Sequence, residues 1–206
     1  MKKYFKKNKK EIIIIGITSL LFIILSILVA TNITTKFDTL IHSYILNIRT
    51  NNLTKILTVI TNLAGASFLL ALTILLIIFM KNKKIPIYMF FNLVFAFIIN
   101  ELAKNIFLRS RPIGINLIDE TGLSFPSGHS MVGLSFYGFI IYILIKNMKN
   151  KKLKNTFIIL LILLIITIGF SRIYLGVHYF TDIIGGFLLA IIYLNIYIKF
   201  VKLEKK

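Results

Sequence analysis

Long apolar stretches alternate with short polar segments along the chain. The six apolar stretches cover residues 12–30, 56–80, 85–103, 127–145, 156–170 and 183–201. A helix needs about 20 predominantly apolar residues to cross a bilayer. Because the fourth and fifth stretches are short, we extend them into the polar motifs beside them. The pattern predicts an all-α, polytopic membrane bundle of six transmembrane helices, with residues 1–206 forming a single membrane domain.

Composition favours a membrane protein and excludes several kinds of site. Hydrophobic residues make up 57% of the chain and charged residues 16%, and the mean hydropathy is +0.87. Soluble domains average about 45–50% apolar and about 25% charged residues. The chain contains no cysteine, which excludes a disulfide scaffold, a thiol nucleophile and a zinc–thiolate site.

The basic residues indicate how the predicted spans are oriented. The formal net charge of +18 would suggest a nucleic-acid partner in a soluble protein. Here most of the basic side chains fall in four clusters between the spans: Lys2, Lys3, Lys6, Lys7, Lys9 and Lys10; Lys81, Lys83 and Lys84; Lys146, Lys149, Lys151, Lys152 and Lys154; and Lys199, Lys202, Lys205 and Lys206. With six spans, all four clusters lie on one side, which the positive-inside rule assigns to the cytoplasm. We therefore expect both termini in the cytoplasm, the clusters against anionic lipid headgroups, and no nucleic-acid partner.

The loops at 31–55, 104–126 and 171–182 then face outward. Within the first of them, apolar side chains stand at positions 37, 40, 41, 44, 45 and 48, which is helical spacing. The segment 31–55 is therefore predicted to hold an amphipathic helix on the outer membrane surface. His42 on this helix is expected to be an interfacial residue.

Cations in the outward loops run against the topology rule and need another explanation. Lys104 ends the third span, and Arg111 follows seven residues later, just before Pro112. A guanidinium offers a planar fork of donors and an ammonium a point charge, so the two could hold separate oxygens of one phosphate. The alternative is that both side chains extend to lipid headgroups, and this is what we expect of Arg109.

The start of the fourth span combines several features of an anion site. Pro126, Ser127, Gly128 and His129 stand where the helix begins. The free N–H groups of a helix N-terminus bind anions, glycine allows a ligand to approach the backbone, and the serine adds a hydroxyl donor. The alternative interpretation is an ordinary helix start, although an imidazole at this position favours a functional use.

A histidine and an aspartate precede the sixth span. His178 and Asp182 are four residues apart, which on a helix places them on one face and within contact. A carboxylate bonded to one ring nitrogen fixes the tautomer and leaves the other nitrogen free to attack an electrophile. The alternative is a buried pair that serves stability only.

Together these segments resemble the type 2 phosphatidic acid phosphatase family, which shares a superfamily with bacterial acid phosphatases and vanadium haloperoxidases. The family pattern is Lys, six residues, Arg-Pro; then Pro-Ser-Gly-His; then Ser-Arg, five residues, His, three residues, Asp. The chain matches all three parts, in order and without substitution, from Lys104 to Asp182. The six-span layout with the motifs on the outer side fits the family as well.

The resemblance implies a role for each matched residue. His178 would attack phosphorus and form a phosphohistidine, Asp182 would orient it, and His129 would protonate the leaving oxygen. The phosphate oxygens would be held by Lys104, Arg111, Arg172, the Ser127 hydroxyl and the Gly128 amide. Phosphoryl transfer depends mainly on positioning and on fixed positive charge around the equatorial oxygens.

We expect no metal ion and no other cofactor, because three cations can supply the charge that a metal gives other phosphatases. Only two of the seven acids are adjacent, Asp119 and Glu120, and they are expected to be solvated loop residues. Glu101 lies one helical turn before Lys104, within reach of its ammonium group.

The sequence thus predicts metal-independent hydrolysis of a lipid phosphate or pyrophosphate at the outer face of the cytoplasmic membrane, in a bacterium by its Lys-, Ile- and Asn-rich composition. The substrates considered are phosphatidylglycerophosphate, phosphatidic acid and undecaprenyl pyrophosphate. The Pro-Ser-Gly-His motif makes the chain most similar to small bacterial phosphatidylglycerophosphate phosphatases, because dedicated undecaprenyl pyrophosphate phosphatases commonly have Pro-Ser-Asp-His.

Other functions remain open at this point. A lipid phosphotransferase with the same site and a dedicated undecaprenyl pyrophosphate phosphatase are the main alternatives. The six spans argue against a haloperoxidase. The absence of ionisable residues from the middle of the spans argues against a transporter. The expected partners are the lipid substrate and membrane lipids, and no obligate protein partner is evident.

Overall fold

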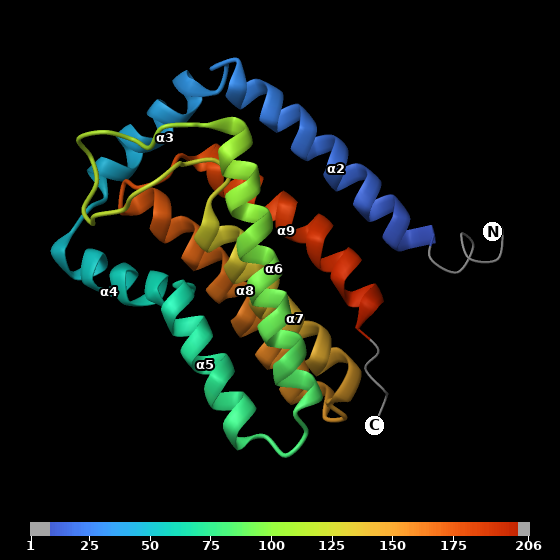
Figure 1. Ribbon diagram of the computed structural model, residues 1–206. Helices are drawn as coiled ribbons and strands as arrows, with labels where there is room; N and C mark the ends of the chain where they lie inside the picture. The colour runs from blue at the N-terminus through green and yellow to red at the C-terminus, as the bar shows by residue number, and fades with distance from the viewer. Residues whose placement is uncertain (1–8, 202–206) are drawn as a thin grey trace.

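The computed structural model describes residues 9–201, and within that range every regular element is an α-helix (Figure 1). In chain order the helices are α2 (Lys9–Ala30), α3 (Thr35–Asn47), α4 (Asn51–Asn62), α5 (Ala66–Phe79), α6 (Lys84–Phe107), α7 (Gly128–Asn147), α8 (Lys151–Tyr174) and α9 (Phe180–Phe200). The outer members of the first and last basic clusters lie outside the described residues: Lys2, Lys3, Lys6, Lys7, Lys202, Lys205 and Lys206.

The predicted spans are present, with one of them broken. Helices α2, α6, α7, α8 and α9 are each long and apolar enough to cross a membrane. The predicted span over 56–80 is instead the pair α4 and α5, which is bent by 49° and reaches the same criterion only as a pair. Backbone groups freed by such a break need partners in an apolar environment. Tyr137 supplies one, because its hydroxyl donates to the carbonyl of Leu63 at 2.6 Å.

Helix α8 begins earlier than its apolar stretch because a polar residue caps it. The Asn150 side chain accepts a hydrogen bond from the Leu153 amide at 3.1 Å, and this satisfies one of the free donors at the helix start. The helix therefore runs through the basic cluster before it enters the apolar stretch predicted over 156–170. At 24 residues, α8 is as long as α6.

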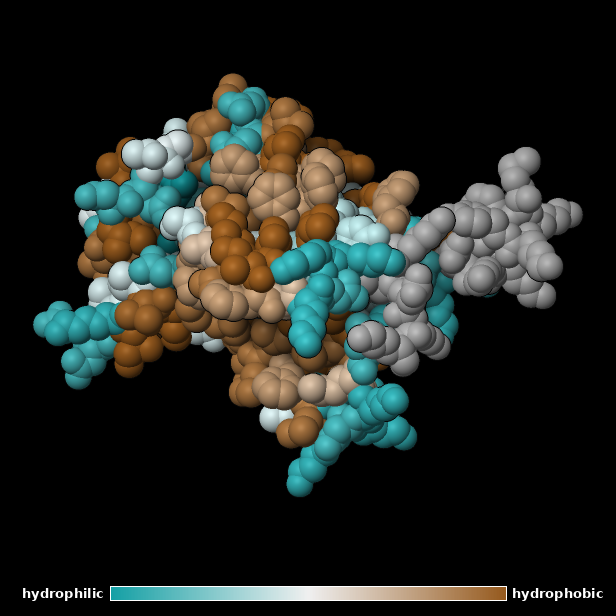
Figure 2. Space-filling view, turned by 60° about the horizontal axis from the view of Figure 1, so that its bottom comes forward, coloured by the Kyte–Doolittle hydropathy of each residue, from teal (hydrophilic) through white to brown (hydrophobic). Residues whose placement is uncertain are grey.

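The described members of the basic clusters gather at one end of the bundle. The α5–α6 and α7–α8 connections and the last turn of α9 lie at the lower end of Figure 1. An ion pair of 3.8 Å between Lys199 and Glu11 joins the end of α9 to the start of α2. Figure 2 turns this end toward the viewer and shows separate hydrophilic groups projecting from a mostly hydrophobic surface. The loops that carry the predicted site lie at the opposite end.

Helix α7 lies at the centre of the bundle and packs against α6, α8 and α9, while α2 packs along α9. Small residues allow the start of α9 to approach its neighbours closely, as is common between membrane helices. A Cβ on Gly186 would lie 2.7 Å from the carbonyl oxygen of Ser127, and one on Gly185 would lie 2.4 Å from the ring of Phe125. These glycines allow the loop before α7 to pack against the second turn of α9.

Helix α3 forms within the predicted surface segment, but two of its three buried residues are polar. Phe37 and Tyr44, two of the apolar positions that suggested the helix, are exposed. Asp38, His42 and Ile45 are buried instead. The expectation that His42 is an interfacial residue is therefore wrong, because hydrogen-bond partners deeper in the fold hold this face inward.

Candidate active site

Three segments that are distant in sequence meet at the upper end of the bundle through backbone hydrogen bonds. The amide of Ser124 donates to the carbonyl of Arg109 at 2.8 Å and so closes the loop between α6 and α7. The amide of Ser127 donates to the carbonyl of Asp182 at 3.0 Å, which joins this loop to α9. The three sequence motifs are thereby brought to one place.

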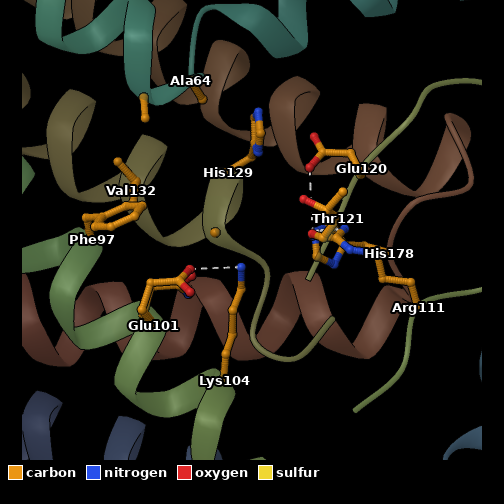
Figure 3. A pocket seen from close by; sticks show the side chains of 13 residues that line it. Ala64, Phe97, Glu101, Lys104, Arg111, Glu120, Thr121, His129, Val132 and His178 are labelled. Atoms are coloured by element: carbon orange, nitrogen blue, oxygen red, sulfur yellow. Dashed lines mark hydrogen bonds and ion pairs between the residues drawn. The ribbon is translucent and has the colours of Figure 1, made fainter. Parts of the chain in front are cut away.

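A cavity of about 150 Å³ lies where these segments meet (Figure 3). Its lining includes five of the eight predicted site residues: Lys104, Arg111, Gly128, His129 and His178. Apolar residues of the α4–α5 break and of α6, Ala64, Ala66 and Phe97, line it as well. The other predicted residues, Asp182, Arg172 and Ser127, lie behind this lining and are buried. The cavity thus joins cations and imidazoles to an apolar wall.

His178 and Asp182 form the predicted pair, but the two residues do not share a helix. His178 precedes α9, and Asp182 is the third residue of that helix, where its carboxylate accepts from the Tyr179 amide at 2.8 Å. The Oδ2 atom of Asp182 lies 3.4 Å from Nδ1 of His178. Ser124 joins the pair, because its hydroxyl donates to the same Oδ2 at 2.5 Å and lies 3.3 Å from Nδ1. The capping turn, rather than one helix face, brings the pair together.

The second ring nitrogen of His178 faces a cation. Its Nε2 lies 3.0 Å from Nη1 of Arg111. Because a guanidinium can only donate hydrogen bonds, this contact requires a lone pair on Nε2. Burial of the ring lowers the pKa of His178 to about 4, although Asp182 acts in the opposite direction. The imidazole is therefore neutral at pH 7, with its proton on Nδ1 toward the carboxylate.

Glu120 bridges two of the predicted phosphate-binding arginines. Its Oε1 forms an ion pair with Nη2 of Arg172, and its Oε2 lies 3.7 Å from Nη2 of Arg111. Burial alone would raise the pKa of Glu120, but Arg172 and Arg111 lower it overall. The expectation that Glu120 is a solvated loop residue is wrong, because its carboxylate lines the cavity beside both guanidinium groups.

Lys104 lies on the opposite side of the cavity from Glu120 (Figure 3), and Gly128 lines the cavity near it. The Lys104 ammonium pairs with Glu101 at 3.0 Å, as their spacing suggested. A Cβ on Gly128 would lie 3.1 Å from Oδ1 of Asn100 and 3.8 Å from Nζ of Lys104. The glycine therefore keeps open the space between the start of α7 and the lysine.

The Ser127 hydroxyl is not among the groups that line the cavity. It caps α7, accepting from the Ser130 amide at 3.5 Å and from the Ser130 hydroxyl at 3.1 Å. Ser127 is fully buried in this position. The structure thus gives this side chain a capping contact as an acceptor, and its contact with phosphate stays a prediction.

Arg109 and Asp38 were not predicted as site residues from the sequence. We expected Arg109 to contact lipid headgroups, but its side chain is only 13% exposed and pairs with two buried carboxylates, those of Asp182 at 2.6 Å and Asp38 at 2.7 Å. One signal was available in the sequence. Asp38 and His42 are one helical turn apart on the amphipathic segment, which predicts one polar strip facing the same neighbour.

Comparison with known proteins gives matches over most of the chain. The family model of the PAP2 superfamily matches residues 85–206. Phosphatidylglycerophosphatase B of Bacillus subtilis (strain 168) is 34% identical over 178 residues, covering 84% of this chain and 87% of that protein. The undecaprenyl-diphosphatase of Sulfolobus acidocaldarius is 30% identical over 126 residues, covering 57% of this chain and 56% of that protein.

Two solved structures are also similar. The crystal structure of a transmembrane PAP2 type phosphatidylglycerolphosphate phosphatase from Bacillus subtilis has a TM-score of 0.83 at 31% identity, covering 90% of this chain and 94% of that one. The crystal structure of LpxE from Aquifex aeolicus has a TM-score of 0.62 at 27% identity, with coverages of 77% and 93%. The similarity of the first structure extends well beyond the part matched by the family model.

Proposed function

This chain belongs to the PAP2 superfamily, and we propose that it is a lipid phosphatase that transfers the phosphoryl group to His178 before releasing it to water. Phosphatidylglycerophosphate is the substrate that we favour, since the relative named phosphatidylglycerophosphatase B covers 84% of this chain at 34% identity. The relative named undecaprenyl-diphosphatase makes a lipid pyrophosphate the second candidate.

The observation that carries this proposal is the two-sided environment of His178. Its Nδ1 faces the Asp182 carboxylate at 3.4 Å, and its Nε2 faces Arg111 at 3.0 Å beside the cavity. A nucleophilic imidazole needs one nitrogen held by a carboxylate and the other free of a proton. Both conditions are met at one buried ring.

The reaction then proceeds in two steps. Nε2 of His178 attacks phosphorus, and the bond between phosphorus and the lipid oxygen breaks as the N–P bond forms. The electron pair of the broken bond stays on that oxygen, which takes a proton from His129. A water molecule next attacks the phosphohistidine, giving its proton to His129 while the N–P bond breaks and phosphate leaves. His129 lines the same cavity as His178, which supports its role as the acid and then the base.

Positive charge around the cavity would stabilise the transferring group. Lys104 and Arg111 line it, and Arg172 reaches it through Glu120. Fixed cations that surround developing negative charge in a dry site cost no reorganisation during the reaction. We propose that the phosphate replaces the Glu120 carboxylate between the two arginines, and that neither a metal ion nor another cofactor takes part.

We further propose that one domain over residues 1–206 places this site at the outer face of the cytoplasmic membrane. The described members of the basic clusters lie at the end of the bundle opposite the α6–α7 loop, whose residues help line the cavity, and such clusters mark the cytoplasmic side. The apolar wall formed by Ala64, Ala66 and Phe97 would receive the part of the lipid next to its headgroup.

Phosphate release by the purified protein in detergent, with EDTA present, tests the proposed function. We expect release from phosphatidylglycerophosphate, with phosphatidic acid and undecaprenyl pyrophosphate offered alongside to rank the substrates. The His178→Ala variant should release none while keeping the elution profile and melting temperature of the parent protein. Release by this variant at the parent rate would contradict the mechanism, and no release by the parent from any of the three would contradict the activity.

A further inference from the structure

The carboxylate of Asp182 has a second contact, on the oxygen that faces away from His178. Its Oδ2 faces His178 and Ser124, as described above, whereas its Oδ1 accepts a hydrogen bond from Nη1 of Arg109 at 2.6 Å. A carboxylate that orients a catalytic imidazole must itself be fixed in rotation, because misplacement by about 1 Å can cost a hundredfold in rate. Arg109 is the only cation among residues 9–201 that forms an ion pair with Asp182.

Arg109 is in turn held by a second carboxylate. Its Nη2 donates to Oδ2 of Asp38 at 2.7 Å, and its Nη1 also donates to the Thr181 hydroxyl at 2.7 Å. The guanidinium lies over the ring of Tyr179, with 4.1 Å between its central carbon and the ring centroid. With both terminal nitrogens engaged and one face covered, the arginine has a single orientation.

Asp38 belongs to α3, so the surface helix is linked directly to the proposed catalytic pair. Its side chain is fully buried and also accepts from the amide and the hydroxyl of Thr181, at 3.1 and 2.7 Å. One turn later, Nε2 of His42 lies 3.2 Å from the carbonyl oxygen of His178. The polar face of α3 therefore contacts both His178 and the residue before Asp182.

We propose that Arg109 and Asp38 are positioning residues, which hold the Asp182 carboxylate in line with the His178 ring and make helix α3 part of the catalytic apparatus. This inference rests on the proposed function of His178 and Asp182. Arg109 bonds each carboxylate through a different nitrogen of its planar guanidinium, and this fixed fork of donors sets the position of Asp182 relative to Asp38. Neither residue touches the cavity, so their loss would alter the chemical step more than the binding of substrate.

The variants Arg109→Gln and Asp38→Asn test the proposal by their separate effects on kcat and KM. We expect kcat to fall by about tenfold to a hundredfold in Arg109→Gln, with KM within twofold of the parent value. Arg109→Lys should recover part of kcat, because an ammonium can reach one carboxylate but cannot span both. The double variant should be no slower than Arg109→Gln alone, since the two residues act as a unit.

Arg49→Gln is the matched control. Arg49 follows α3 and ties the same surface segment to α8, donating from Nε to the carbonyl of Tyr174 at 2.9 Å. It is partly buried and carries the same charge, but makes no contact with the proposed catalytic residues. We expect a lower melting temperature for Arg49→Gln with kcat unchanged.

Two outcomes separate this inference from the function on which it rests. If His178→Ala is inactive but Arg109→Gln keeps the parent kcat and loses only stability, as the control does, the positioning role is contradicted and the proposed function stands. If His178→Ala keeps its activity, the proposed mechanism itself fails. If the losses of kcat in Arg109→Gln and Asp38→Asn multiply in the double variant, the two residues act independently, which would also contradict a shared role.

Discussion

Arg111 donates from Nη1 to Nε2 of His178 at 3.0 Å, while the opposite nitrogen of the same ring faces Asp182 at 3.4 Å. The cation therefore marks the unprotonated nitrogen, and the carboxylate marks the protonated one. The arrangement assigns the tautomer of His178 from heavy-atom contacts alone. In the proposed reaction, Arg111 transfers this hydrogen bond from the ring to a phosphate oxygen before His178 attacks, so one side chain would hold the resting imidazole and then bind the substrate.

His178 should titrate far below an ordinary histidine. Burial lowers its pKa to about 4, whereas the unfolded chain binds this proton near pH 6.5. As pH falls from 6.5 toward 4, the unfolded state gains a proton that the folded state does not, so His178 makes stability decrease over this interval. NMR of 15N-histidine-labelled protein would measure the midpoint, with His42→Asn and His129→Asn variants for assignment. A midpoint at or above 6.5 would contradict the buried, neutral ring.

Replacing Glu120 by glutamine should strengthen substrate binding. The carboxylate bridges Arg172 and Arg111 where the phosphate is proposed to lie. While the Glu120 carboxylate occupies this place, phosphate cannot bind. The apparent affinity is therefore reduced in proportion to the fraction of molecules in which the place is open. We expect KM, and the inhibition constant of inorganic phosphate, to fall several-fold in Glu120→Gln. The control is Asp119→Asn, which changes the same charge at a neighbouring exposed position and should leave both constants unchanged. An unchanged KM in Glu120→Gln would contradict the proposal that Glu120 competes with phosphate.

The absence of cysteine makes the orientation of the chain directly testable. Ile113, in the loop beside the site, is 91% exposed, and Asn82 is exposed in the α5–α6 connection. A membrane-impermeant maleimide should label Ile113→Cys in intact cells and Asn82→Cys only after lysis. The reverse pattern would place the site on the cytoplasmic side.

Gly186→Ala should destabilise the protein by displacing the loop that carries the Pro-Ser-Gly-His motif. The new Cβ would lie 2.7 Å from the Ser127 carbonyl oxygen, a backbone atom that cannot turn aside as a side chain can. Overpacking of this kind costs about 1–3 kcal/mol, which a thermal melt in detergent would detect. Gly16→Ala is the control, since no atom lies within 4 Å of its added Cβ, and equal melting temperatures for the two variants would contradict the close approach.

Features that repeat locally could be predicted from the sequence, and features that depend on long-range pairing could not. The apolar stretches located the spans, and the spacing of His178 and Asp182 indicated the pair. The link between Arg109 and Asp38 joins residues 71 positions apart, and no local periodicity encodes such a contact. Glu120 looked solvated for the same reason, since it lies in the α6–α7 loop and its partner Arg172, on α8, is 52 positions away.

Two smaller differences have local physical causes. The second span was predicted as continuous because hydropathy does not register a break whose freed carbonyl is satisfied by a distant Tyr137 hydroxyl. Ser127 was predicted as a phosphate ligand because a serine at a helix start can either cap the helix or bind an anion. The structure shows the capping contact, with the Ser130 hydroxyl donating to Ser127 at 3.1 Å, and the phosphate contact stays a prediction.

Trapping the covalent intermediate would test the central claim most directly. Purified protein would be mixed with phosphatidylglycerophosphate carrying a 32P-labelled terminal phosphate, quenched in alkali within one turnover, and digested for peptide mapping. The account predicts label on the peptide that contains His178, stable in alkali and lost in acid, and none on the His178→Ala variant. Label on any other residue, or a full turnover of phosphate without labelled protein at any quench time, would contradict it.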